Sequence, residues 1–218
     1  MTEFSIEFGG QTIRRSSDYE KGRVTFLLVD MQRIWAEPMM DPTHPHPADS
    51  YFMKRVHGTV IPNQVRILGA CRAAGENVAH TIIESLTADG RDRSLDHKLS
   101  NMHVAKGAPE GAIIPALTPT PNEPVLPKTS SGLFNSTNAD YVLRNLNTKF
   151  LIVAGIVTDQ CVDMAVRDAA DRGYWVTLAA DACATYTEAR HQAALAAFSG
   201  YCWTADTATV VGRLEALR

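Results

Sequence analysis

The chain has 218 residues, of which 45% are hydrophobic and 21% are charged, and its formal net charge at pH 7 is −3. This length suits one large domain with a substantial core, and the composition argues against a disordered or fibrous protein. Lysine and arginine are spread along the chain and form no basic stripe, so we expect no binding to nucleic acid.

The start of the chain and its cysteines predict a cytoplasmic protein. Met1 is followed by Thr-Glu-Phe-Ser-Ile-Glu, which lacks the basic and apolar regions of a secretion signal. No apolar run reaches membrane-spanning length, so no membrane contact is expected. The four cysteines include no Cys-x-x-Cys pair, which indicates free thiols in a reducing compartment, with no disulfide framework and no zinc site.

The first predicted elements are a hairpin and a buried strand. Residues Phe4 to Arg14 alternate loosely around Gly9-Gly10, which indicates a short hairpin within an N-terminal extension, residues 1–22, that serves packing or subunit contact. Val24 to Val29 is a continuous apolar run of the kind found in parallel sheets, and it ends at Asp30. A carboxylate at the carboxyl end of a central strand lies where open α/β sheets bind their ligands.

An irregular stretch rich in Pro, His and Met extends from Ile34 to Gly58. Loops of this length inside a compact domain are usually lids or binding segments. His44 and His46 lie near Asp41, but the interleaved prolines and the lack of a third ligand at helical spacing argue against a metal site. We therefore interpret the histidine pair as part of a surface loop and expect neither a metal nor a cofactor.

A helix, a strand and a charged segment are predicted next. Val60 to Ala74 has helical spacing with Pro62 in the first turn, and Gly75 ends it. Asn77 to Ile83 is the next strand. Residues 84–106 are polar and charged, which indicates a solvated excursion, although Glu84 follows a strand directly and is a candidate site residue.

The middle of the chain predicts short elements around a lysine. Ala112 to Leu117 forms at most a helical turn, and a proline cluster closes it. Val125-Leu126 is a short strand that delivers Lys128 into a Thr-Ser-Ser-Gly loop. The run Phe134-Asn-Ser-Thr137 then begins a helix that continues through Leu146.

The hydrophobic period changes within the stretch from Lys149 to Asp171. Phe150 to Ala154 is a buried strand, and the apolar residues that follow have the spacing of an amphipathic helix. Thr158 suits the N-cap, which would place Cys161 near the third helical position, where free backbone N–H groups and the helix dipole favour a thiolate. The other three cysteines lack such surroundings and are interpreted as buried apolar residues: Cys71, Cys183 and Cys202.

The rest of the chain repeats the strand-helix alternation. The predicted elements are a strand from Trp175 to Ala179, a helix from Glu188 to Phe198, a short strand from Tyr201 to Thr204 and a last helix to Leu217. This alternation predicts a single α/β domain over residues 1–218, a three-layer α/β/α sandwich around a doubly wound, mostly parallel six-stranded sheet. Neither G-x-G-x-x-G, G-x-x-x-x-G-K-[ST] nor G-x-S-x-G occurs, which disfavours a dinucleotide enzyme and a serine hydrolase.

Three chemically useful residues follow three of these strands. Carboxyl ends of neighbouring central strands converge on one crevice, so Asp30, Lys128 and Cys161 are expected to meet there. Each has an ordinary structural explanation alone, but together they supply an acid/base, a cation and a thiol for nucleophilic catalysis.

With these motifs the chain resembles the isochorismatase-like cysteine hydrolases, which include nicotinamidase, N-carbamoylsarcosine amidase, biuret hydrolase and ureidoacrylate amidohydrolase. The resemblance extends from about Val24 to Thr204 and is carried by three ordered motifs. These motifs are Leu-Leu-Val-Asp30-Met-Gln32, Leu-Pro-Lys128-x-x-x-Gly-Leu-Phe134-Asn-Ser-Thr137 and Ala-Gly155-Ile-Val-Thr158-Asp-Gln-Cys161-Val. True isochorismatases lack this cysteine, so the resemblance points to the branch that hydrolyses C–N bonds.

The resemblance implies roles for individual residues. Cys161 would be the nucleophile, Asp30 the general base and then acid, and Lys128 the cation that holds both. A non-proline cis peptide is implied between Ile156 and Val157, with the Val157 and Cys161 amides forming the oxyanion hole.

Substrate contacts are predicted around this set. Trp35 occupies the place of an aromatic substrate wall in the family, Gln32, Glu84 and Asn135 would suit a ureido group, and the Phe134 motif fits several ureido and amide hydrolases. The Asp-x-His metal set of nicotinamidases has no counterpart after the second strand of the sheet, which reads His80-Thr-Ile-Ile-Glu84. We therefore expect a small-molecule amide, ureido or carbamoyl substrate and no metal.

Two other functions stay open at the level of sequence. One is hydrolysis of a vinyl ether by Asp30 and Lys128 without covalent catalysis, with Cys161 incidental. The other is a catalytically silent relative that serves as a binding or assembly partner. Whichever function holds, we expect a homo-oligomer, either a dimer or a tetramer. The hairpin and the apolar segment from Ala193 to Trp203 are candidate contact surfaces.

Overall fold

Six parallel strands form the central sheet of the computed structural model, which describes residues 6–8, 11–13, 15–198 and 200–218. Their order across the sheet is β5, β4, β3, β6, β7, β8, and every neighbouring pair is parallel. The strands are β3 (Val24–Val29), β4 (Asn77–Ile83), β5 (Val125–Lys128), β6 (Phe150–Ile156), β7 (Trp175–Ala184) and β8 (Trp203–Ala205). The predicted six-stranded α/β sheet is confirmed, and it is entirely parallel.

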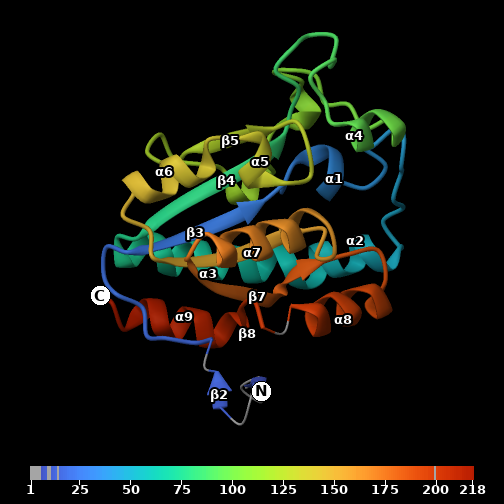
Figure 1. Ribbon diagram of the computed structural model, residues 1–218. Coiled ribbons are helices and arrows are strands. Elements are labelled where there is room, and N and C mark those ends of the chain that lie inside the picture. The colour runs from blue at the N-terminus through green and yellow to red at the C-terminus, as the bar shows by residue number, and fades with distance from the viewer. Residues whose placement is uncertain (1–5, 9–10, 14, 199) are drawn as a thin grey trace.

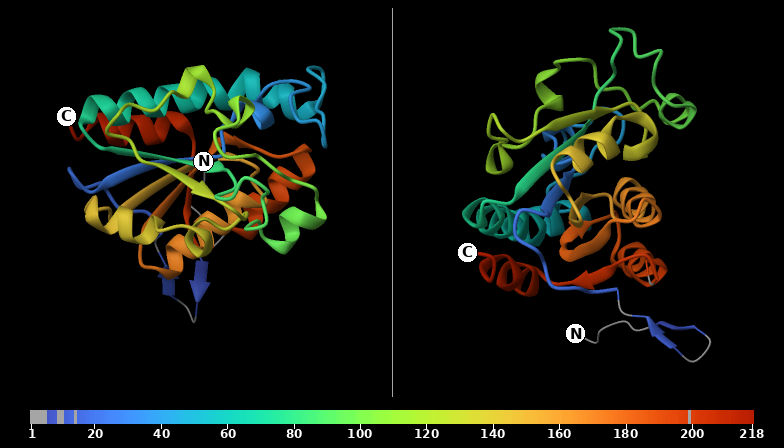
Figure 2. Two further views of the ribbon diagram at one scale, coloured as in Figure 1. Left: turned by 90° about the horizontal axis from the view of Figure 1, so that it is seen from above. Right: turned by 60° about the vertical axis from the view of Figure 1, so that its left-hand side comes forward.

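Helices cover both faces of this sheet (Figures 1 and 2). On one face lie α3 (Ile61–Ala74) and α9 (Thr207–Glu215), which contact each other, and on the other lie α5 (Leu133–Ser136), α6 (Ala139–Asn145) and α7 (Cys161–Asp171). The remaining helices are α1 (Arg33–Ala36), α2 (Tyr51–Arg55), α4 (Leu95–Leu99), α8 (Glu188–Ala197) and the short 3-10 turns Pro109–Gly111 and Pro115–Leu117. The result is the predicted three-layer sandwich.

The chain reverses its direction of travel across the sheet between β3 and β6. From β3 it moves outward through β4 to β5, and it then returns to β6 beside β3 before moving outward through β7 to β8. Ligands of open α/β sheets bind at such a switch point, outside the carboxyl ends of the strands. In this protein Asp30 and Cys161 follow the two strands that flank the switch point.

Gly155 allows β6 to lie against β3 at this point. The two strands pair with Val29 opposite Gly155, whose φ is 143°. A Cβ atom on Gly155 would lie 2.2 Å from the Val29 carbonyl oxygen, far inside van der Waals contact. Only glycine fits, because both the backbone conformation and the close approach exclude a side chain.

Two helical segments differ from the expectation. Residues 51–58, expected to be irregular, lie in α2 and in one π-helical turn (Val56–Val60) that runs directly into α3. The helix predicted from Phe134 to Leu146 is broken into α5 and α6, because Thr137 has an extended backbone and its hydroxyl accepts a hydrogen bond from the Ala139 amide. The spacing of apolar residues does not reveal such a break, since both halves keep helical periodicity.

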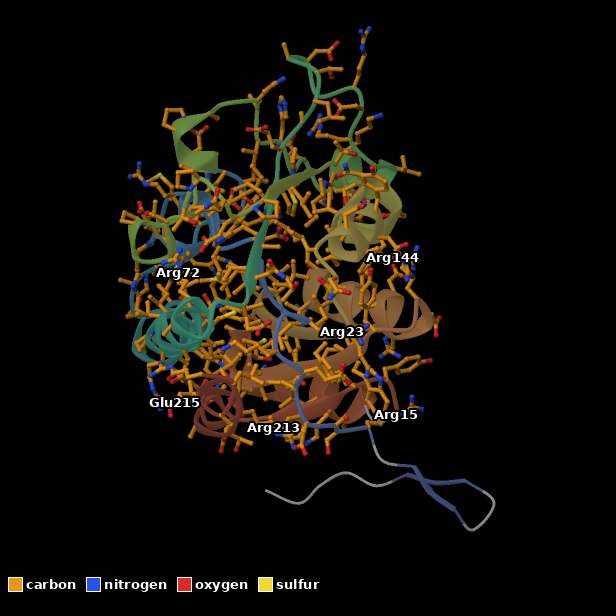
Figure 3. All side chains as sticks on the ribbon, turned by 90° about the vertical axis from the view of Figure 1, so that its left-hand side faces the viewer. Arg15, Arg23, Arg72, Arg144, Arg213 and Glu215 are labelled. Carbon is orange, nitrogen blue, oxygen red and sulfur yellow. The ribbon has the colours of Figure 1, made fainter. Side chains whose placement is uncertain are left out.

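The predicted N-terminal hairpin is confirmed as a strand pair. β1 (Ile6–Phe8) pairs antiparallel with β2 (Gln11–Ile13), whereas the Gly9-Gly10 turn lies outside the described residues. Figure 3 shows the pair projecting away from the three-layer domain. Among the helices of the described residues, none has both the length and the apolar character needed to span a bilayer.

Candidate active site

Asp30, Lys128 and Cys161 lie in direct contact at the carboxyl ends of the strands. Lys128 Nζ forms an ion pair with Asp30 Oδ2 at 2.8 Å and donates a hydrogen bond to Cys161 Sγ at 3.4 Å. The Cys161 thiol is in turn hydrogen-bonded to the Asp30 carboxylate. These groups are separated by up to 131 residues along the chain, since Asp30 is the first of them and Cys161 the last. The sheet therefore brings together the three residues that the sequence singled out.

Further hydrogen bonds fix this cluster in the core. The side chains of Lys128 and Asp30 are 1% and 2% exposed. Thr81 donates to Asp30 Oδ1 at 2.7 Å, and Lys128 Nζ also donates to the Ser130 carbonyl at 3.1 Å. Asp30 itself has φ 55°, in the left-handed region, so the chain leaves its strand conformation at this residue. Buried charges persist only with such partners.

The Cys161 sulfur is a thiol in the resting site. Burial raises its pKa to about 12; the Lys128 charge opposes this shift and the Asp30 carboxylate adds to it. For Lys128, burial alone would lower the pKa, but Asp30 and the Cys161 sulfur outweigh burial and raise that pKa above its ordinary value. The ammonium therefore stays charged, and a base must remove the thiol proton before the sulfur can attack.

The expected helix cap is wrong, but Cys161 still lies in the first turn of α7, at the positive end of the helix dipole. The residue before α7 is Gln160, without a side-chain cap, and Cys161 is the first helical residue, not the third. The Thr158 hydroxyl, expected to cap the helix, instead faces Nδ1 of His191 at 2.9 Å. Thr158 is fully buried, so its hydroxyl required a partner, and the histidine supplies it.

The turn before Cys161 presents two free amide groups. The Ile156–Val157 peptide is cis, as the resemblance implied. In the part of the chain that the structure describes, no acceptor is hydrogen-bonded to the amide N–H of Val157 or of Cys161. Both residues line the cavity beside the sulfur. Two such donors can stabilise an oxyanion that forms within the cavity.

A cavity opens onto the sulfur and the Asp30 carboxylate. Of the predicted site residues, Asp30, Trp35, Val157 and Cys161 line it, and Lys128 lies beneath, against Asp30 and Cys161. The other lining residues are mostly apolar or aromatic: Ile34, Asp41, His44, His46, Phe52, Ile83, Met102, Ile156, Gln160 and Tyr186.

Gln32 was predicted to contact substrate, but it is fully buried behind the cavity. Its amide donates to the carbonyls of Ile83 and Gly111 and accepts from the Ile83 amide and from Trp35 Nε1. Every polar atom of the Gln32 amide is therefore occupied. Gln32 fixes the position of the Trp35 ring and does not line the cavity.

Three further predicted contacts do not line the cavity either. Glu84 accepts a hydrogen bond from the Gly107 amide and lies at a separate surface hollow. Phe134 is buried against Tyr174, and Asn135 is exposed, with its side-chain oxygen accepting from Ser130. The motifs around these residues shape the fold next to the site instead.

The loop of residues 37–50 contributes lining residues that the sequence did not assign to the site. Asp41, His44 and His46 come from it, and the His46 ring stacks on Tyr186 at 5.1 Å between ring centroids. The histidine pair lies on a surface loop as predicted, with the His44 side chain 54% exposed, and the loop also lines the cavity, which agrees with the expectation of a binding segment. The unusual length of the irregular stretch was the available signal. Over the described residues, no group of three or more His, Cys, Asp or Glu side chains is arranged to hold a metal ion.

A buried histidine supports the turn that carries Cys161. His191, 1% exposed, faces Thr158 through Nδ1 and receives a hydrogen bond on Nε2 from Arg55 Nη2 at 2.8 Å. A guanidinium can only donate, so Nε2 accepts and Nδ1 carries the ring proton. Burial, followed by the Arg55 charge, lowers the pKa of His191 to about 4. The ring is therefore neutral at pH 7.

This neutral histidine predicts acid sensitivity of the fold. The folded-state pKa of about 4 lies below the ordinary 6.5, so the unfolded chain binds more protons between these values. The contribution of His191 to the free energy of unfolding is fully present above pH 6.5 and is lost as the pH falls towards 4. Between pH 7 and pH 4.5 we expect this residue to account for about 2 kcal/mol of the lost free energy of unfolding.

Urea unfolding of the wild type and of His191→Gln at both pH values measures this share. The glutamine keeps polar atoms but does not titrate, so the variant should lose about 2 kcal/mol less than the wild type. Burial also lowers the pKa values of His80 and His97, but both residues are present in both proteins, so their effects cancel in the difference. Equal losses in the two proteins would contradict the neutral, buried state of His191.

Comparison with known proteins identifies the family. The isochorismatase domain model matches residues 24–209. Ureidoacrylate amidohydrolase RutB of Methylobacterium radiotolerans is 36% identical over 205 residues, which cover 84% of this chain and 77% of that protein. RutB of Methylorubrum extorquens strain AM1 is 39% identical over 88 residues, which cover 40% of this chain and 36% of that protein. This chain thus matches about a third of the length of some relatives and most of the length of another.

Solved structures share the fold at lower identity. A cysteine hydrolase from Pseudomonas syringae pv. phaseolicola has a TM-score of 0.82 at 24% identity, covering 93% of this chain and 97% of that one. The N-carbamoylsarcosine amidase of Thermoplasma acidophilum has a TM-score of 0.67 at 20% identity, covering 85% and 96%. Because the family model spans the sheet and all three residues of the buried cluster, and a relative matches along most of its length, the chain belongs to the isochorismatase family.

Proposed function

We propose that this isochorismatase-family hydrolase cleaves a C–N bond in a small amide, ureido or carbamoyl compound through a covalent intermediate on Cys161. The observation that carries the proposal is the contact of a thiol with both a carboxylate and an ammonium at the floor of a cavity. The amidohydrolase names of the relatives support the same class of reaction.

Attack on the substrate begins with a proton transfer. Asp30 accepts the thiol proton while the sulfur electron pair adds to the carbonyl carbon, so the C–S bond forms as the carbonyl π bond opens. The carbonyl oxygen becomes an oxyanion, and the free amides of Val157 and Cys161 are positioned to receive it. Lys128 keeps its charge throughout and offsets the negative charge that Asp30 and the sulfur share.

Collapse of this intermediate breaks the C–N bond. The departing nitrogen takes the proton held by Asp30 and leaves as ammonia or an amine, and the acyl or carbamoyl group stays on the sulfur. Asp30, again a carboxylate, then removes a proton from water, whose oxygen adds to the same carbon. The C–S bond breaks, the sulfur recovers a proton and the acid product leaves. One water is consumed in each cycle.

A screen for ammonia release tests the reaction class. Purified protein is incubated with ureido acids, biuret, carbamoyl amino acids, simple ureas and nicotinamide, and the ammonia is measured with a coupled assay. We expect release from at least one ureido, carbamoyl or amide compound and no release above background from Cys161→Ala. An absence of release from the whole panel, combined with turnover of a vinyl ether substrate, would overturn the proposal.

A further inference from the structure

The loop wall of the cavity carries a carboxylate that forms no ion pair with a lysine or arginine of the described residues. Asp41 lines the cavity and is only 7% exposed. One of its oxygens, Oδ1, accepts from the Thr43 amide at 2.8 Å. The other, Oδ2, lies 3.8 Å from His44 Nδ1, which is beyond hydrogen-bond distance. Asp41 therefore keeps an oxygen for a ligand in the cavity.

No lysine or arginine lines the cavity within the described residues. Lys128, beneath the sulfur, is committed to Asp30. Arg190 packs on the ring of Tyr186, but its Nε donates to Asp159 at 2.6 Å. An anionic group of a substrate would therefore meet Asp41 without a free lysine or arginine to balance it, and like charges in a partly desolvated site repel strongly.

The other walls suit a flat, uncharged group. Trp35 and Tyr186 line the cavity with Phe52, and the His46 ring stacks on Tyr186. Burial is the main cause that lowers the pKa of His46, so this ring is neutral at pH 7 and adds no positive charge. Planar amides and ureas can lie against aromatic faces while their N–H groups donate to a carboxylate.

Resting on the proposed function, we infer that the substrate is a neutral or cationic amide or urea whose N–H groups donate to Asp41, and that carboxylate-bearing analogues are disfavoured. The inferred substrate differs from the compound in the relatives' name, ureidoacrylate amidohydrolase, because ureidoacrylate carries a carboxylate. Asp41 is then a specificity-determining residue that acts through its charge and its hydrogen bonds.

Alkylation of Cys161 by two matched reagents tests the charge of the cavity without knowledge of the substrate. Iodoacetamide is neutral and iodoacetate is anionic, and both react with the same thiolate, so the thiol pKa cancels in the ratio of their rates. Labelling is followed by peptide mass spectrometry, with Cys161→Ala as the blank. Relative to the same ratio for glutathione, we expect Cys161 to prefer iodoacetamide by about tenfold or more.

Two asparagine variants show whether the charge of Asp41 causes the preference for iodoacetamide. Asp41→Asn should bring the ratio close to the glutathione value, because it removes the charge and keeps the shape. Asp49→Asn, an exposed carboxylate of the same loop that does not line the cavity, should leave the ratio unchanged. A wild-type ratio equal to that of glutathione, or one that Asp41→Asn does not alter, would overturn the inference.

A pair of substrates extends the test to turnover. Ammonia release from 3-ureidopropionate is compared with release from its methyl ester, which differs by one charge. We expect kcat/KM to be about tenfold or more higher for the ester, and Asp41→Asn should narrow the gap. Preference for the free acid would refute the inference while leaving C–N hydrolysis intact. If neither compound nor any of the wider panel is hydrolysed while a vinyl ether substrate is turned over, the proposed function fails, and the alkylation ratio still decides the role of Asp41.

Discussion

Replacement of Cys161 by alanine is expected to reduce hydrolysis by about 10⁴-fold or more, to the level of the background reaction. Loss of a covalent nucleophile removes the reaction path itself, and in other hydrolases such losses reach about 10⁶-fold in kcat. The fold should survive, because alanine is small and apolar like its surroundings, at a cost of about 1 kcal/mol. Ammonia release and urea unfolding of the same preparation measure both effects.

Cys183→Ala is the matched control for this change. Cys183 is also buried and free, and burial raises its pKa to about 12, but it lies in β7 and does not line the cavity. Its alanine variant should keep its activity within about threefold of the wild type. Unchanged turnover in Cys161→Ala would instead favour the non-covalent mechanism in which Asp30 and Lys128 act without the sulfur.

Replacement of Lys128 by methionine is expected to destabilise the fold by about 3–5 kcal/mol and to lower activity by at least about 100-fold. Methionine fills most of the space of the lysine stem, but the Asp30 carboxylate is left buried without its cation. Removal of one partner from a buried ion pair typically costs this much. Urea unfolding gives the stability change, and ammonia release gives the loss of activity.

A double variant separates the two effects of Lys128. Asp30→Asn combined with Lys128→Met removes both charges, and asparagine tolerates the left-handed backbone of residue 30. We expect it to recover at least half of the stability lost by Lys128→Met, because a neutral pair has no uncompensated charge. Activity should stay absent, since the base is gone. Recovery of activity with stability would show that Lys128 and Asp30 are structural only.

The convergence of the three site residues could be predicted from sequence because strands and turns are local features. Val24–Val29 is buried along its whole length and is almost entirely apolar, and Asn77–Ile83 is mostly buried, so both strands were predicted with the bounds that the structure shows. A parallel sheet then requires that their carboxyl ends share one edge. Asp30 after β3, Lys128 at the end of β5 and Cys161 after β6 meet there for that reason.

The walls of the cavity could not be predicted in this way. Asp41 and His46 line the cavity because the loop of residues 37–50 packs against it, and a loop position depends on contacts with distant residues such as Tyr186. Gln32 failed as a substrate contact for a related reason, since its amide is bonded to the backbone at Ile83 and Gly111, far along the chain. The direction of a side chain after the end of a strand depends on tertiary contacts, which local sequence does not reveal.

Thr158 shows a limit of local capping rules. Threonine before a helix is a common N-cap, yet here its hydroxyl faces His191, 33 residues away. The Thr158 hydroxyl is buried and therefore needs a partner, which the His191 ring supplies. The helix α7 begins at Cys161 without a side-chain cap. The same contact connects α8 to the turn that precedes Cys161.

Mass spectrometry of the intact protein after acid quench tests the central claim most directly. With a hydrolysed ureido or amide compound at saturating concentration, the quenched wild type should gain the mass of the acyl or carbamoyl group, on the peptide that contains Cys161, and lose it when the substrate is exhausted. Two results together would contradict the claim. The wild type would release ammonia without any adduct on that peptide, even when samples are quenched within the first turnover, and the Cys161→Ala variant would still hydrolyse the substrate.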